Sequence, residues 1–171
     1  QQSKKSFQEN PKPVSDYILD GKYQDQVKAQ ENLTYMQPFY DLLKKHQGKM
    51  IYIDFWGPWC PPCLAEMEPL KELRKKYSTD DIVFISICRS DDRKQYKQVL
   101  DKYGMHVDGI EHIHADDLQT ESQVHKMYNQ LNIDGIPYFF IINREGVIVN
   151  YGSMMRPSYP GTAECIEEWL E

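Results

Sequence analysis

Residues 50–63 read MIYIDFWGPWCPPC, and this stretch decides how the chain is expected to fold. Its first seven residues are apolar except for Asp54, and Gly48 and Gly57 bound them. This length and the β-branched content predict a buried strand. Two prolines then open residues 61–77, where apolar side chains recur at helical spacing, and prolines suit the first turn of a helix. The two cysteines are therefore expected where a buried strand turns into a helix.

The rest of the chain alternates strand-like and helix-like patterns. Apolar runs predict a second strand at 82–88 and a hairpin of 138–142 with 147–151, whose short connection ends in glycine. Helical spacing predicts a short helix before Gly48 and further helices around 96–103, 124–131 and 162–170, the last with Thr162 as its N-cap. Pro69 should kink the helix expected at 61–77. Strands joined by helices, followed by a hairpin, predict an α/β fold with a parallel part in its sheet.

Composition limits the partners of this chain. Its 171 residues carry 20 basic and 26 acidic side chains, a formal net charge of −6. Lys and Arg supply most of the affinity for nucleic acid, so this balance argues against a nucleic-acid partner. The longest apolar run, 136–142, is far shorter than the ~20 residues of a membrane-spanning helix. We therefore expect no transmembrane segment in this chain.

The chain is expected to form one domain preceded by an arm. At this length one full hydrophobic core can form, and we assign it to residues 31–171. Residues 1–30 are polar and contain Pro11 and Pro13, which predicts an N-terminal arm that is weakly ordered or packed on the domain. The sequence starts with Gln1 and no signal-like apolar segment follows, so we expect the natural start to lie upstream.

Cys60 and Cys63 carry the chemistry. Unpaired N–H groups and a partial positive charge at a helix start stabilise an anion, so a thiol held there can ionise near or below neutral pH. Cys60 is therefore the expected nucleophile, accessible to solvent, with Cys63 behind it. Pro61 and Pro62 stiffen the turn that keeps the two sulfurs within disulfide range.

Two other uses of this cysteine pair stay open. Cys60 and Cys63 with His112 and His114 would supply four zinc ligands, although the histidines alternate as in a strand and show no ordinary ligand spacing. The second alternative is a permanent structural disulfide, although a core of this size hardly needs the small stabilisation that a disulfide across so short a loop provides. The remaining cysteines, Cys88 and Cys165, lie in apolar patterns and are expected to be buried thiols.

The segments DFWGPWCPPC and GIPYFFIINREG resemble the thioredoxin superfamily, and within it the extracytoplasmic TlpA/ResA-like thiol–disulfide oxidoreductases. The resemblance covers residues 49–170. It implies a thioredoxin-like fold in which helices flank a central mixed sheet. It also implies an inserted helix–strand segment, expected at 93–114, between the second strand and a hairpin introduced by a cis-proline.

The resemblance also implies roles for individual residues. Cys60 would attack a substrate disulfide and Cys63 would resolve the mixed disulfide. Asp54 would exchange a proton with Cys63, which fits a carboxyl whose pKa is raised by burial in an apolar strand. Glu66, one helical turn after Cys63, matches a second acid near the cysteines. A further group of residues would contact the substrate: Trp59, Pro61, Pro62, Ile136 and the cis-proline, Pro137.

We therefore expect a thiol–disulfide oxidoreductase that acts on protein disulfides without a cofactor or metal. No His separates the two cysteines, which favours a reductase. Its partners would be disulfide-containing proteins and a membrane or soluble thiol donor, and the protein would be a monomer. The resemblance places it in the periplasm or elsewhere outside the cytoplasm, where an anchor upstream of Gln1 would tie it to the membrane. The alternatives are a metal- or partner-binding module of this fold and a disulfide isomerase or oxidant.

Overall fold

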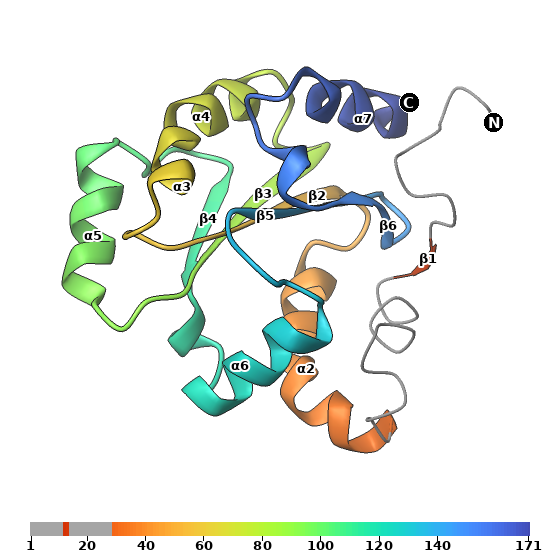
Figure 1. The fold of residues 1–171 in the computed structure, drawn as a ribbon. Coiled ribbons are helices and arrows are strands. Elements are labelled where there is room, and N and C mark those ends of the chain that lie inside the picture. Colours follow the sequence, from red (N-terminus) through yellow and green to blue (C-terminus); the bar gives the residue numbers. More distant parts are fainter. Residues whose placement is uncertain (1–11, 14–28) are drawn as a thin grey trace.

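The computed structural model describes residues 12–13 and 29–171 and shows a sheet between two layers of helices (Figure 1). The strands follow the order β1-β6-β5-β2-β3-β4 across the sheet. Their bounds are β1 Lys12–Pro13, β2 Met50–Trp56, β3 Ile82–Cys88, β4 Ile110–His114, β5 Tyr138–Ile142 and β6 Val147–Tyr151. β2, β3 and β4 run parallel, whereas β5 is antiparallel to both β2 and β6. The mixed sheet confirms the predicted fold class.

Helices cover both faces of the sheet. They are α2 Ala29–Lys45, α3 Pro61–Ala65, α4 Met67–Lys75, α5 Arg93–Lys102, α6 Glu121–Gln130 and α7 Pro160–Leu170, with short 3-10 turns η3 Ala115–Asp117 and η4 Ser153–Met155. One core cluster joins β2 to α4, α5 and α7, and the other joins it to α2 and α6. Figure 1 shows α3, α4 and α7 above the sheet and α2 and α6 below it.

β2 is the central strand, and its position explains its composition. All seven of its residues are buried because both faces of the sheet are covered. Alternate side chains enter opposite cores: Tyr52 and Trp56 lie in the cluster with α4, whereas Ile53 and Phe55 lie in the cluster with α2. Asp54 therefore shares a face with Tyr52 and Trp56, on the side of α3 and α4.

The helix predicted at 61–77 is two helices. α3 ends at Ala65, Glu66 leaves helical geometry with φ −93° and ψ 0°, and α4 starts at Met67. Pro69 has no N–H to donate to the carbonyl of Ala65, and its ring would clash with that carbonyl in a continuous helix. The kink expected from Pro69 is therefore a full break placed one turn before it.

The start of α7 differs from the prediction. Tyr159 is the N-cap and Pro160 occupies the first turn, so the helix begins before Thr162. The hydroxyl of Thr162 instead donates to the carbonyl of Arg156 at 2.8 Å. The prediction of Thr162 as N-cap was wrong because Pro160 already has the backbone angle that a helix start requires.

The remaining elements lie where the patterns place them. α5 and β4 occupy the 93–114 segment. α2 contains Pro38 and begins at Ala29, earlier than the short helix that the sequence suggests. Most of the predicted arm lies outside the described residues, so the division at residue 30 stays a prediction. Within the part that the structure describes, every helix is too short or too polar to cross a membrane.

Candidate active site

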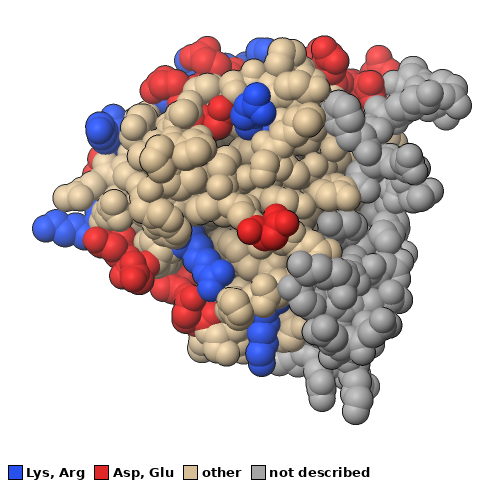
Figure 2. Space-filling model, viewed as in Figure 1, with Lys and Arg blue, Asp and Glu red and all other residues tan. Residues whose placement is uncertain are grey.

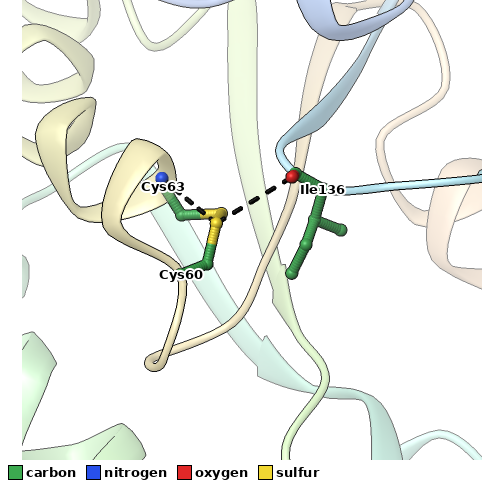
Figure 3. The surroundings of a disulfide bond; sticks show 3 residues. All are labelled: Cys60, Cys63 and Ile136. Carbon is green, nitrogen blue, oxygen red and sulfur yellow. Dashed lines mark hydrogen bonds between the residues drawn. A yellow bond between two sulfur atoms is a disulfide. The ribbon is translucent and has the colours of Figure 1, made fainter.

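Cys60 and Cys63 form a disulfide at the turn between β2 and α3, with their Cα atoms 5.2 Å apart (Figure 3). Cys60 is the N-cap of α3. The turn lies at the carboxyl end of β2, the same edge of the sheet at which β3 and β4 end and β5 begins. The strand-to-helix position predicted for the pair is therefore the one observed.

A backbone amide points at the first sulfur. Pro61 and Pro62 fill the first two positions of α3 and have no N–H, so the first amide that α3 can offer its cap is that of Cys63. This N–H donates to Cys60 Sγ at 3.3 Å. α3 is only five residues long, and dipole effects act within one turn. The hydrogen bond from the Cys63 N–H therefore stabilises negative charge on Cys60 Sγ more than the dipole of the whole helix does.

Cys60 is more covered than its sequence context predicts, whereas Cys63 is buried as expected. Cys60 is 6% exposed and Cys63 is 3% exposed. Cys60 Sγ lies 3.9 Å from the carbonyl oxygen of Ile136, which covers it from the side of β5 (Figure 3). The order of accessibility is as predicted, but Cys60 is almost completely covered instead of accessible to solvent.

Trp59 directly precedes Cys60 and is 56% exposed. Its ring lies against Gly57, where a Cβ atom would come within 2.6 Å of the indole. Glycine at this position therefore lets the indole fold back over the turn beside Cys60. Trp56 is buried instead, at 1% exposure, and packs in the core cluster that contains both cysteines.

Asp54 is buried beneath this turn, at 7% exposure, on the sheet face that also carries the cysteine cluster. Burial, followed by repulsion from Glu66, raises the pKa of its carboxyl to about 8. A carboxyl with such a pKa can take up or release a proton near neutral pH. The placement fits the proton-exchange role expected for Asp54.

Glu66 has a partner that the sequence does not suggest. Ser158 donates both its backbone N–H, at 2.8 Å, and its hydroxyl, at 2.7 Å, to the Glu66 carboxylate. The bonds tie the break between α3 and α4 to the segment before α7. Glu66 is close enough to act on the Asp54 charge, but its hydrogen bonds go to Ser158 and not to a cysteine. No local pattern could have revealed Ser158, which lies 92 residues away.

The Ile136–Pro137 peptide bond is cis and lies just before β5. The carbonyl oxygen of Ile136 lies 3.9 Å from Cys60 Sγ, as described above. The residues expected to contact substrate, Trp59, Pro61, Pro62, Ile136 and Pro137, thus come from two segments that meet around the sulfurs. Whether they bind substrate stays a prediction.

The zinc alternative needs residues that the structure keeps apart. His112 Nε2 donates to the carbonyl of Met105 at 2.6 Å, and His114 receives the Asp116 N–H at 3.2 Å on its Nδ1. Both lie on or at the end of β4, separated from β2 by β3. Among the described residues, no three His, Cys, Asp or Glu side chains converge as a metal site would require.

A cleft of about 860 Å³ opens beside the disulfide. Trp59 and Ile136 form part of its wall. Arg89, Tyr128 and Asp134 form other parts of the wall. Sequence analysis missed this cleft because its walls come from segments far apart in the chain. The only available signal was that residues after parallel strands gather at one edge of a sheet.

Comparison with known proteins adds to this geometry. The profile of the thioredoxin-like family matches residues 48–148. The chain belongs to the thioredoxin-like family. This assignment confirms the resemblance drawn from the WCPPC and Ile-Pro segments.

Thioredoxin-like relatives share both sequence and fold with this chain. The thiol–disulfide oxidoreductase ResA of Halalkalibacterium halodurans is 26% identical over 75% of this chain and 65% of its own length. ResA of Bacillus thuringiensis is 27% identical over 63% of this chain. The chain spans only 56% of that second relative. A candidate thiol–disulfide oxidoreductase from Bacteroides vulgatus, solved in solution, is 36% identical over 75% of this chain and 78% of its own, with a TM-score of 0.59.

Proposed function

We propose that this protein reduces disulfides of protein substrates through Cys60 and Cys63, outside the cytoplasm. The observation that carries the proposal is the Cys63 N–H directed at Cys60 Sγ at a helix start. A thiolate is the nucleophile of thiol–disulfide exchange, and a hydrogen-bond donor aimed at the sulfur stabilises it. Similarity to thiol–disulfide oxidoreductases supports the same chemistry.

The reaction would proceed in two exchanges. The Cys60 thiolate attacks one sulfur of the substrate disulfide; a Cys60–substrate disulfide forms, and the other substrate sulfur leaves as a thiolate that takes a proton. Cys63, deprotonated, then attacks Cys60 Sγ and releases the second substrate thiolate. Two electrons pass to the substrate, and the protein is left with the Cys60–Cys63 disulfide seen in the structure.

Asp54 would serve the second exchange. Cys63 must lose a proton before it attacks, and Asp54 lies on the sheet face that packs against Cys63. With a pKa of about 8, its carboxyl can accept that proton and return it to the departing substrate sulfur. Glu66 would act indirectly, by raising the pKa of Asp54 and by holding the α3–α4 break against Ser158.

The recycling partner would be a thiol donor, soluble or in the membrane, that reduces the Cys60–Cys63 disulfide after each turnover. A location outside the cytoplasm accords with the TlpA/ResA resemblance. The protein would act as a monomer.

The redox potential tests the proposal. We would equilibrate the protein in glutathione or dithiothreitol buffers and separate alkylated Cys60 from the disulfide form by mass. A potential of about −250 mV or lower is expected for a reductase, whereas a value near −120 mV belongs to strong oxidants and would contradict the direction proposed here. The matched control is the Cys88→Ser, Cys165→Ser variant, which should give the same potential.

A further inference from the structure

The cleft beside the disulfide is built from the ends of several strands. Arg89 and Asp91 follow β3, Asp116 follows β4, and Ile136 precedes β5. Its wall includes Trp59, which adjoins Cys60 in sequence, and Ile136, whose carbonyl oxygen lies 3.9 Å from Cys60 Sγ. A chain lying in this cleft would therefore run alongside the sulfur that reacts.

The charges of this cleft are strongly unequal. Four carboxylates border it, those of Asp91, Asp116, Glu121 and Asp134, against the single guanidinium of Arg89. Arg89 is already engaged, because its Nη2 donates to Glu121 at 2.8 Å. Figure 2 shows acidic side chains gathered between α5 and α6, below a mostly uncharged surface over α3.

Arg93 is paired with Asp117 at 2.7 Å and also attracts Asp116, but among the described residues no cation is paired with Asp91 or Asp134. His114 lies 3.8 Å from Asp116, and its Nδ1 accepts the Asp116 N–H. His114 therefore contacts Asp116 through the backbone N–H of Asp116 as well as through its carboxylate, and it faces neither Asp91 nor Asp134 in any contact of the described residues. The wall of the cleft beside the disulfide therefore carries an excess of negative charge.

Tyr128 supplies a second, independent sign of a ligand. It lines the cleft, is 5% exposed, and its hydroxyl has no hydrogen-bond partner among the described residues. The Phe55 ring packs edge-on at 5.4 Å and the Arg89 guanidinium lies 5.0 Å over the Tyr128 ring. Both contacts hold the ring in place. A buried hydroxyl without a partner loses free energy. The hydroxyl oxygen is itself covered, so a peptide group bound in the cleft would supply the missing hydrogen bond after a small shift of the Tyr128 side chain.

We propose that this cleft selects protein substrates in which Lys or Arg flanks the reacting cysteine, with Asp91 and Asp134 facing the cation and Tyr128 bonding the substrate backbone. The inference rests on the proposed exchange reaction and adds a substrate class to it. The volume of the cleft is of the size that holds several side chains or a small ligand. Carboxylates beside the reacting sulfur would raise the encounter rate of basic segments and lower that of acidic ones.

Three disulfide peptides test the selection. Each has the same length and one internal disulfide, and the residues flanking its cysteines are Lys, Gln or Glu. The reduced protein is mixed with each peptide at low ionic strength, and second-order rate constants of peptide reduction are measured. We expect the Lys peptide to react about tenfold faster than the Glu peptide, with the Gln peptide between them, and the ratio to shrink in high salt.

Matched charge variants separate the cleft from the net charge of the protein. Asp91→Asn with Asp134→Asn should reduce the Lys-to-Glu ratio to about twofold. Asp80→Asn with Asp108→Asn changes the net charge equally, but these exposed residues precede β3 and β4, at the opposite edge of the sheet. This control should keep the full ratio. An equal loss in both variants would overturn the proposal.

Tyr128→Phe isolates the hydroxyl. It should slow reduction of all three peptides severalfold while leaving the Lys-to-Glu ratio intact, because the ring and the carboxylates remain. Equal rates for the three peptides with the wild-type protein would refute the selectivity but leave the exchange reaction standing. Failure of the wild-type protein to reduce any peptide would refute the proposed function itself.

Discussion

Cys60 and Cys165 are almost equally covered, at 6% and 5% exposure, yet their surroundings differ in kind. Cys60 Sγ accepts a backbone N–H at a helix start. Cys165 lies inside α7, where burial raises the pKa of its thiol to about 12 and the Asn150 side chain, 4.0 Å away, offsets only part of that. Accessibility alone therefore does not mark the reactive cysteine. The direction of the nearest backbone amide does.

Cys88 sharpens the same contrast. It ends β3 beside Trp56 on β2, at the same sheet edge as the redox turn. It is fully buried, and that burial raises the pKa of its thiol to about 12. Proximity to the active edge therefore does not by itself lower the pKa of a thiol, because burial of the Cys88 sulfur acts in the opposite direction.

Replacing the nucleophile should have the largest effect. Cys60→Ser should lower the rate of insulin disulfide reduction by about a thousandfold or more, since a hydroxyl at this pH is not a nucleophile for disulfides. Cys88→Ser with Cys165→Ser is the matched control and should retain full activity. Loss of activity in that control would contradict the distinction between a reactive Cys60 and the buried thiols Cys88 and Cys165.

Cys63→Ser extends this test, because the backbone N–H that faces Cys60 remains. A mixed disulfide with substrate should accumulate on Cys60, visible as a mass increase lost on reduction. Capture of the same substrates on Cys63 in a Cys60→Ser variant would reverse the assignment of nucleophile.

Asp54→Asn should have the next largest effect on turnover. Because the pKa of Asp54 is about 8, the wild-type rate of mixed-disulfide resolution should rise with pH through that value as the carboxylate forms. The amide cannot accept the proton, so resolution should slow by about a hundredfold at pH 8. Stopped-flow rates across pH 6–9 measure this. A variant with an unchanged pH profile would contradict the role of Asp54.

The same variant should be more stable than the wild type at neutral and alkaline pH. The folded-state pKa of Asp54, about 8, lies above the ~3.9 of an unfolded chain. The folded state therefore binds more protons between these values, and wild-type stability falls as pH rises from about 4 to 8. Asp54→Asn removes this loss, so its advantage in unfolding free energy should grow over that range to about 5 kcal/mol. Denaturant melts at several pH values test it; an advantage that is constant with pH would contradict it.

Glu66→Gln should have the smallest effect. Glu66 raises the pKa of Asp54 only as the second cause after burial, so its neutralisation should move the pH midpoint of resolution downward by less than about one unit. The Gln carbonyl can still accept from Ser158, which preserves the tether. Glu72→Gln, an exposed residue paired with Lys75 on α4, is the control and should leave the midpoint in place. A large loss of activity in Glu66→Gln would show that the carboxylate acts directly.

Local patterns were sufficient for most elements and for the redox turn. The buried run of β2, the prolines after Cys60 and the glycine-ended hairpin act within a few residues, so their positions follow from short-range physics. Pro69 was predicted to disturb the helix at 61–77, but the position of the break, at Glu66, depends on the clash between the proline ring and the carbonyl of Ala65. The last helix was predicted to begin after Thr162, but it begins at Pro160.

Long-range contacts could not be predicted in the same way. Ser158 donates to Glu66, from which it is 92 residues distant in the sequence. Tyr128 lines the cleft because α6 packs on the face of the sheet that also carries α2. These contacts depend on how whole elements pack together. The covering of Cys60 by Ile136 is of the same kind, since it arises only when β5 is placed beside β2.

Titration of the Cys60 thiol tests the central claim most directly. In a reduced Cys63→Ser, Cys88→Ser, Cys165→Ser variant, Cys60 is the one remaining thiol, and thiolate absorbance in the ultraviolet reports its ionisation. We expect a pKa of Cys60 well below the ordinary ~8.5 of a cysteine, because the amide of residue 63 still faces the sulfur. A Cys60 pKa at or above that ordinary value would contradict this claim.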